Sequence, residues 1–210
     1  MEGAAQAIGR RLVLASGSPA RLATLRAAGI EPEVIVSGVD EDDIEELPAA
    51  DHALVLARRK ALAVTGVLCG LPALVLGCDS VLALDDEILG KPGTPEEAVR
   101  RWRQMRNRSG ILHTGHCLVE TGSGQRAEAT ASTVVHFAAV SDDEIDAYVA
   151  TGEPLDVAGG FKVDGLGGPF VERIDGDPHT VVGLSLPLLR KLLADLGVFL
   201  PDLWAERVRT

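Results

Sequence analysis

The chain has 210 residues, of which 46% are hydrophobic and 3% aromatic, so aliphatic side chains must form its core. Its 31 acidic and 20 basic residues give a net charge of −11, which repels a phosphate backbone and argues against a nucleic-acid partner. No apolar run approaches the roughly 18 residues of a membrane helix, and the start lacks a signal-peptide pattern. We therefore expect no membrane span and a cytoplasmic location.

The first half of the chain alternates short apolar runs with helical patterns. We expect strands over residues 12–16 and 33–37 and a long core strand over residues 73–84. Helices are expected over residues 19–28 and 48–65, and an acidic loop over residues 40–46 precedes the second helix. Ser18 as N-cap and Pro19 in the first turn are typical of a helix start, and Gly29 of a helix end. A turn at residues 85–86 should double the long strand back as a hairpin.

The second half of the chain continues this alternation. Capping boxes formed by Thr94 with Glu97 and by Ser141 with Glu144 predict two helix starts. Strands are expected over residues 111–120, 131–137 and 170–174. A glycine-rich segment over residues 158–169 precedes the last of these strands, and a final helix is expected over residues 186–196. The pattern predicts an α/β fold with a mixed sheet, in which residues 12–210 form one domain behind an N-terminal extension over residues 1–11.

The turn from Ser16 to Arg21 is the first candidate for chemistry. A strand that turns directly into a helix leaves unpaired backbone N–H groups, which favour an anion at the helix start. Arg21 adds a positive charge one turn into the helix, where it would otherwise oppose the helix dipole. The alternative is an ordinary capped junction with a surface arginine, because the segment lacks the GxxxxGK[ST] pattern of a P-loop.

Asp79 is the second candidate, because it lies within the apolar run 74–84. A carboxylate in such a run is costly unless it reaches a site, a metal or a partner. Gly77, two residues earlier, permits the close approach of another chain segment. The alternative interpretation is a turn residue at the end of a strand.

Two lysines could bind phosphate as point charges. Lys91 is fixed between Gly90 and Pro92, just after the expected hairpin, and Lys60 lies in the long helix. Each signal is weak alone, because most exposed lysines are only solvated, and basic residues near a helix end commonly complement the dipole.

Other patterns favour structural interpretations. The acidic loop 40–46 could supply a metal ligand, but a charge run is usually a solvated surface. His113 and His116 should point to opposite faces of a strand, which argues against a shared zinc site. The three cysteines, Cys69, Cys78 and Cys117, are expected to be buried reduced thiols. The glycine-rich segment lacks a full GxGxxG before a helix, which argues against a dinucleotide-binding fold.

Taken together, these segments resemble the Maf family of nucleoside-triphosphate pyrophosphatases from about residue 12 to residue 196. The resemblance is carried by Ser16-Gly-Ser-Pro-Ala-Arg21, Gly77-Cys-Asp-Ser80, Gly90-Lys-Pro92, Ala158-Gly-Gly-Phe-Lys-Val-Asp-Gly165 and Gly176-Asp-Pro-His-Thr-Val-Val-Gly-Leu184. It implies an elongated mixed-sheet fold related to inosine triphosphate pyrophosphatase, with a central cleft between two lobes, in a homodimer. It also implies hydrolysis of a nucleoside triphosphate to the monophosphate and pyrophosphate, which would remove noncanonical or surplus nucleotides.

The resemblance assigns roles to individual residues. Asp79 matches the catalytic proton acceptor, and Glu41 matches a carboxylate that, together with Asp79, would hold a divalent cation, Mg²⁺ or Mn²⁺. Five positions match phosphate-handling residues, namely Ser16, Ser18, Arg21, Lys60 and Lys91. In this scheme a carboxylate directs water to the α-phosphorus, while the cations offset the negative charge of the triphosphate.

Three positions, Ala20, Ser80 and Asp164, bear on the choice of nucleobase. The family commonly has arginine where this chain has Ala20. The pyrimidine-selective branch has threonine in place of Ser80 and glutamine in place of Asp164. The branch acting on 7-methyl-GTP has glutamine and glutamate at these two positions, so the chain matches neither set and base preference stays open.

Two functions of other classes remain as alternatives. A non-catalytic regulator of cell division could bind a nucleotide without turning it over, since Maf proteins are associated with septum formation. A phosphatase acting on monoesters is the other, although the chain lacks the DxDx[TV] and Cys-x₅-Arg patterns of such enzymes.

Overall fold

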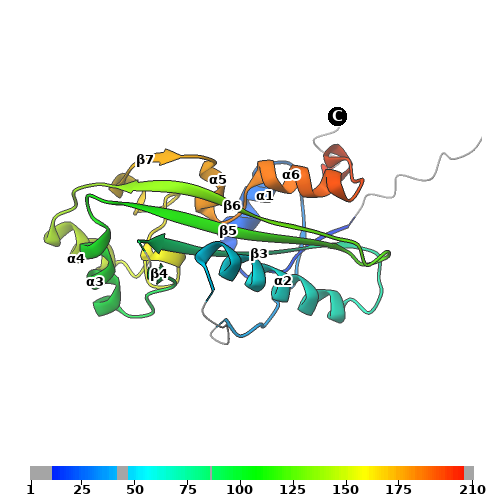
Figure 1. Ribbon diagram of the computed structural model, residues 1–210, viewed down its shortest axis with the longest axis horizontal. Helices are drawn as coiled ribbons and strands as arrows, with labels where there is room; N and C mark the ends of the chain where they lie inside the picture. Colours follow the sequence, from blue (N-terminus) through cyan, green and yellow to red (C-terminus); the bar gives the residue numbers. More distant parts are fainter. Residues whose placement is uncertain (1–10, 42–46, 86, 206–210) are drawn as a thin grey trace, which may run out of the picture.

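A computed structural model describes residues 11–41, 47–85 and 87–205 (Figure 1). Most of the expected N-terminal extension, most of the acidic loop and one residue of the expected turn lie outside the described residues. The strands are β1 (Leu12–Leu14), β2 (Glu33–Val34), β3 (Leu74–Leu84), β4 (Glu87–Leu89), β5 (Ser109–Glu120), β6 (Arg126–Phe137) and β7 (Val171–Asp175). The helices are α1 (Pro19–Ala27), α2 (Ala49–Val67), α3 (Pro95–Met105), α4 (Asp142–Ala150), α5 (Pro178–Val182) and α6 (Leu186–Asp195), with 3-10 turns at Ala158–Gly160, Gly168–Phe170 and Leu200–Leu203.

The strands form one mixed sheet in the order β2-β1-β3-β5-β6-β7, with β4 paired to β3. Strand β1 is parallel to β2 and β3, while the remaining pairs are antiparallel. The long strands β3, β5 and β6 run along the length of an elongated molecule (Figure 1). The expected α/β fold with a mixed sheet is confirmed, whereas the division into two lobes remains a prediction.

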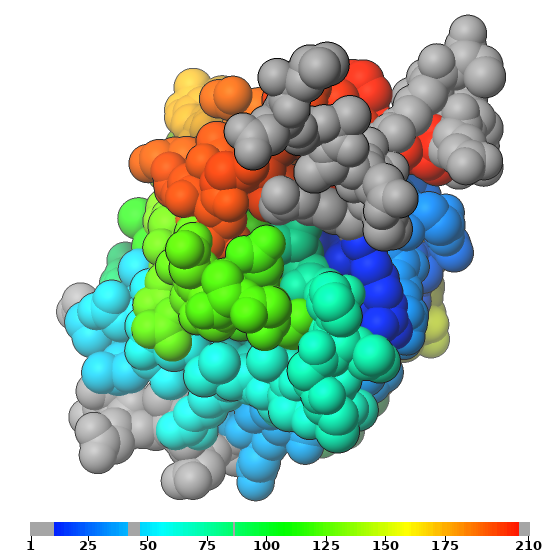
Figure 2. Space-filling model, turned by 90° about the vertical axis from the view of Figure 1, so that its right-hand side faces the viewer, coloured from blue at the N-terminus to red at the C-terminus, as the bar shows by residue number. Residues whose placement is uncertain are grey.

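Helices cover both faces of the sheet. Helix α2 contacts β3, β5 and β6 from one face, and α5 and α6 contact β5 and β6 from the other (Figure 1). Figure 2 shows the turn between β5 and β6 at one end of the sheet, with α6 on one side and α2 on the other. Leucines of α6 and alanines of α2 are buried in separate clusters on the two faces, and Trp102 of α3 centres a third cluster. No helix in the described ranges is long and apolar enough to cross a membrane.

Helix α2 approaches the sheet closely because two glycines face it. A Cβ atom at Gly77 would overlap the carbonyl oxygen of Ala57, and one at Gly115 would overlap the α2 backbone as well. Gly115 is the register partner of Asp79. The close approach expected from Gly77 is therefore confirmed, and it brings α2 directly against the part of β3 that carries Asp79.

Several boundaries differ from expectation. Strand β2 ends at Val34, because both of its residues are exposed at the sheet edge and gain little from burial. Strand β6 begins at Arg126, since pairing with β5 extends it through a polar segment that lacks an apolar run. Helix α5 escaped the periodicity argument because it has five residues; its signals are the Asp177 cap and the following proline.

The two expected capping boxes have different outcomes. At α4 both reciprocal bonds of the Ser141–Glu144 box are present, so that box is confirmed. At α3 the Thr94 hydroxyl accepts from the backbone N–H of Glu97, as expected. The Glu97 carboxylate, however, binds the guanidinium groups of Arg100 and Arg101. Only the first half of the Thr94 box is therefore seen in the described region.

Candidate active site

The site lies at the carboxyl ends of the parallel strands, where one connecting helix packs on one face of the sheet and the next connecting helix packs on the other. Helix α1 leaves β1 on one face and connects to β2, while α2 packs on the opposite face and connects to β3 (Figure 1). In open α/β sheets such a reversal at the carboxyl ends of parallel strands creates a crevice that commonly binds ligands. The segment from Ser16 to Arg21 lies at this point.

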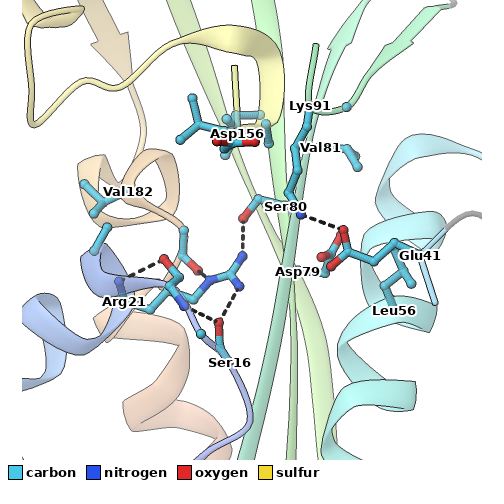
Figure 3. A pocket seen from close by; sticks show the side chains of 18 of the residues that line it. Ser16, Arg21, Glu41, Leu56, Asp79, Ser80, Val81, Lys91, Asp156 and Val182 are labelled. Atoms are coloured by element: carbon cyan, nitrogen blue, oxygen red, sulfur yellow. Dashed lines mark hydrogen bonds and ion pairs between the residues drawn. The ribbon is translucent and has the colours of Figure 1, made fainter. Parts of the chain in front are cut away.

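Strand β3 continues past β1, and here its edge pairs with no other strand of the described residues. Residues 74–76 pair with β1 and residues 82–84 pair with β4, which leaves residues 77–81 between them. Asp79 and Ser80 lie on this edge and point to opposite faces of the sheet, because successive strand residues alternate. Asp79 faces α2, and Ser80 faces α1 and α5 (Figure 3). The site therefore wraps around one strand edge.

On the α2 side, lysines and carboxylates alternate. The Nζ atom of Lys60 donates to Asp79 Oδ1 at 2.6 Å and to Glu41 Oε1 at 2.6 Å. Lys91 Nζ donates to the second oxygen of Glu41 at 2.8 Å. Lys60 and Asp79 are buried, each with 7% of the residue exposed, whereas Lys91 is exposed. Two charges of each sign thus balance in a cluster that is buried at one end.

Burial alone would raise the pKa of Glu41, but the hydrogen bonds and charges of Lys60 and Lys91 outweigh it. The pKa of this carboxyl falls to about 2. Glu41 is therefore ionised at any pH near neutral, and it is available as an anionic ligand.

On the other side, the buried guanidinium of Arg21 is held by neutral oxygens. Its Nε donates to the carbonyl of Gly183 at 2.8 Å, Nη1 to Ser16 Oγ at 3.1 Å and Nη2 to Ser80 Oγ at 3.2 Å (Figure 3). Among the described residues, no carboxylate forms a salt bridge with Arg21. Two of its N–H groups have no partner within the described ranges, and a buried cation with neutral partners and N–H donors to spare suits an anionic ligand.

The two sides share one pocket of about 1490 Å³. This exceeds the roughly 300–1,000 Å³ of typical small-molecule sites, so a nucleotide with three phosphates fits in size. The pocket is lined by all ten residues proposed from the sequence, namely Ser16, Ser18, Ala20, Arg21, Glu41, Lys60, Asp79, Ser80, Lys91 and Asp164. Their proximity is established by the structure, and their individual roles remain proposals.

The site also contains residues that the sequence patterns did not reveal. Gly183 lies in the segment 176–184 that carries the family resemblance, but the resemblance assigns it no role. Its carbonyl follows α5, and a helix-capping argument at residues 177–183 could have indicated it. Glu153 shapes the loop that carries Asp164, because its carboxylate accepts the N–H groups of Leu166 and Gly167. Burial would raise the pKa of Glu153, but these donors hold the pKa below its ordinary value. A glutamate between two helices gives no sequence signal for such a role.

The cysteines and histidines lie mostly as expected. Cys78 and Cys117 are buried free thiols, but Cys69 is exposed, so that part of the cysteine prediction is wrong. Cys69 lies in the turn after α2, outside the packed layers. The two histidines of β5 alternate as predicted: His113 is half-buried and His116 is fully buried.

His116 is held neutral by its two partners. Its Nδ1 lies 3.0 Å from the carbonyl of Thr114, which can only accept, and its Nε2 accepts the N–H of Ser185 at 2.9 Å. The proton therefore resides on Nδ1. Burial lowers the pKa of His116 to about 4.

We expect this histidine to make stability depend on pH. Between pH 6.5 and 4 the unfolded chain binds more protons at His116 than the folded chain, so the free energy of unfolding falls as pH falls. The full effect is about 3 kcal/mol, since one pKa unit corresponds to about 1.4 kcal/mol. Urea unfolding at pH 6.5 and 4.5 should show a steeper loss for the wild type than for His116→Gln. His179→Gln, at an exposed histidine, serves as a control. If the free energy of unfolding falls equally with pH in all three proteins, His116 is not the source of the pH dependence.

Glu41 and Asp79 also fit a shared divalent cation. Both carboxylates converge on one point, since both contact Lys60 Nζ. No group of three or more candidate ligand residues occurs in the described ranges. Mg²⁺ in proteins retains several waters and binds through one or two carboxylates together with substrate phosphates, so two carboxylates are enough to take part in such a site.

The chain is similar to members of one known protein family. The family model for Maf-like protein matches residues 11–196. A nucleoside triphosphate pyrophosphatase of Salinispora tropica is 62% identical over 205 residues, covering 95% of this chain and 90% of that protein. One of Streptomyces coelicolor is 59% identical over 196 residues, covering 93% and 95%. The solved structure of the Staphylococcus aureus Ham1 protein matches with a TM-score of 0.39 and 15% identity, over 62% of this chain and 73% of that one.

Proposed function

Since the chain belongs to the Maf-like family and is a nucleoside triphosphate pyrophosphatase, we propose that it cleaves the α-β phosphoanhydride in the pocket around Asp79. The observation that carries the proposal is the position of Asp79. This buried carboxylate lies at a strand edge, between cations from three different parts of the chain. The products are a nucleoside monophosphate and pyrophosphate.

Asp79 supplies the base for this reaction. A water oxygen attacks the α-phosphorus, the bond from that phosphorus to the bridging oxygen breaks, and pyrophosphate leaves. Asp79 accepts the proton of the water as the new bond forms. Lys60 holds one oxygen of Asp79 at 2.6 Å, which orients the carboxylate and leaves its other oxygen for the water.

The cations of the pocket receive the negative charge. Arg21, with two N–H donors left, binds phosphate oxygens on the α1 side, where Ser16, Ser18 and the start of the helix add neutral donors. Lys91 is exposed, and its ion pair is with Glu41, so its flexible side chain can move with the departing pyrophosphate and offset its charge. This local cluster allows a protein of net charge −11 to bind an acidic ligand.

A divalent cation held by Glu41 and Asp79 would neutralise phosphate charge and polarise the reacting phosphoryl group. We further propose a homodimer in the cytoplasm, with no nucleic-acid partner, which the family resemblance and the acidic net charge support. Ala20, Ser80 and Asp164 line the same pocket and are proposed to select the nucleobase.

A substrate panel with resolved products tests the function. We expect Mg²⁺- or Mn²⁺-dependent release of pyrophosphate from at least one canonical or modified nucleoside triphosphate, and its loss when EDTA removes the cation. Release of orthophosphate would instead indicate a phosphatase. Tight nucleotide binding without turnover on the whole panel would favour the non-catalytic regulator and contradict the proposal.

A further inference from the structure

Arg21 depends on a hydrogen-bond chain that continues behind it into the sheet. Ser80, which accepts from its Nη2 group, lies 2.9 Å from the hydroxyl of Thr114 on the neighbouring strand. These two residues are register partners of β3 and β5. The Thr114 hydroxyl in turn donates to the carbonyl of Thr180 in α5 at 2.8 Å.

The direction of these bonds is determined by Thr114. A threonine hydroxyl has one proton, and that of Thr114 is used by the Thr180 carbonyl, which can only accept. Toward Ser80, Thr114 is therefore the acceptor, so the Ser80 hydroxyl donates to it. The lone pairs of Ser80 are then directed toward Arg21. Thr114 is fully buried, with 0% exposed, so water cannot replace it in this role.

Thr114 also supports the second anchor of Arg21. Its bond to the Thr180 carbonyl ties β5 to α5, and the next residues lead to Gly183, whose carbonyl accepts from Nε of Arg21. The packing here is tight, since a Cβ atom on Gly183 would lie 3.2 Å from Arg21 Nε. One hydroxyl thus connects to two of the three oxygens that hold the guanidinium.

We propose that Thr114 is a positioning residue for Arg21. It contacts no substrate, but it fixes the guanidinium so that the two remaining N–H donors are directed at the phosphates. The inference rests on the proposed function of the pocket. Without the hydroxyl, Ser80 loses its acceptor and can rotate, and the Thr180 carbonyl keeps only the N–H of Gly183 as a donor.

Thr114→Val, which keeps the shape and removes the hydroxyl, is the main test. We expect kcat/KM for pyrophosphate release to fall about 10- to 100-fold, because a misplaced binding group can cost about two orders of magnitude. Thr114→Ser should restore most of the activity. In an Arg21→Ala background, Thr114→Val should cause almost no further loss, because residues that act through one another are not additive.

Thr133→Val is the matched control. Thr133 is a buried threonine on β6 whose hydroxyl also donates to a carbonyl next to α5, that of Asp177, but it does not contact Ser80 or Arg21. We expect this variant to lose stability while kcat/KM stays within about threefold, as for a structural hydroxyl. If Thr114→Val fails to fold, Ser80→Ala replaces it in the comparison with Arg21→Ala. This variant removes the hydroxyl that links Thr114 to Arg21.

The outcomes separate two failures. A wild-type protein that releases no pyrophosphate from any triphosphate would refute the proposed function. An active wild type in which the losses from Thr114→Val and Arg21→Ala multiply would refute the positioning role alone. The same refutation would follow if Thr133→Val lowered kcat/KM as much as Thr114→Val.

Discussion

Asp79→Asn is expected to lower the rate of pyrophosphate release by about 10²- to 10⁴-fold, the range that a positioned general base contributes. The amide keeps the size and one hydrogen-bonding oxygen of the carboxylate, so Lys60 retains an acceptor. It cannot take up the proton of the attacking water. Nucleotide binding, measured by calorimetry on a slowly hydrolysed substrate without the divalent cation that Asp79 is also proposed to hold, should change much less than turnover.

Two comparisons make this expectation decisive. Asp51→Asn changes a carboxylate to an amide at an exposed position in the first turn of α2, outside the pocket, and should leave turnover near the wild-type rate. Unfolding by urea shows whether the Asp79 variant is folded. A folded Asp79→Asn protein with full turnover would remove Asp79 from the role of base, whatever the function of the pocket.

The local parts of the site follow from the sequence because their causes are local. Ser18 and Pro19 specify a helix start through capping, so the turn that begins α1 could be predicted. Asp79 stood out because the apolar residues around it imply burial, and burial of a carboxylate demands an explanation. Each of these arguments uses residues within a few positions of one another.

The pairing of Lys60 with Asp79 could not be predicted in this way. It depends on how close α2 lies to β3, and that distance depends on Gly77 and on Gly115, a residue 38 positions further along the chain. The anchors of Arg21 were equally hidden. Gly183 contributes a backbone carbonyl, and every residue type has such a carbonyl, so the sequence does not single it out. Thr114 cannot be distinguished from any other strand threonine until its register with Ser80 is known.

Lys60→Met should be among the most destabilising substitutions in the chain. It removes the ammonium that lies 2.6 Å from both Asp79 and Glu41 and leaves a buried carboxylate without its partner. Breaking a buried ion pair from one side costs about 3–5 kcal/mol. Lys91→Met is the matched control, because Lys91 binds the same Glu41 at an exposed position, where a pair contributes about 0–1 kcal/mol.

The same variant tests whether the two carboxylates hold a cation. In Lys60→Met, Asp79 and Glu41 keep their negative charges but lose the ammonium between them. Mg²⁺ or Mn²⁺ should therefore raise the free energy of unfolding more in this variant than in the wild type. At a concentration of about 100 times its Kd for the variant, the cation should stabilise the variant by about 2.7 kcal/mol. The double variant Lys60→Met/Asp79→Asn should regain much of the stability without metal and lose the response to it, because no unpaired buried charge remains. Equal stability of the Lys60 and Lys91 variants would show that the buried pair contributes little, and an unchanged metal response in the double variant would exclude Asp79 as a ligand.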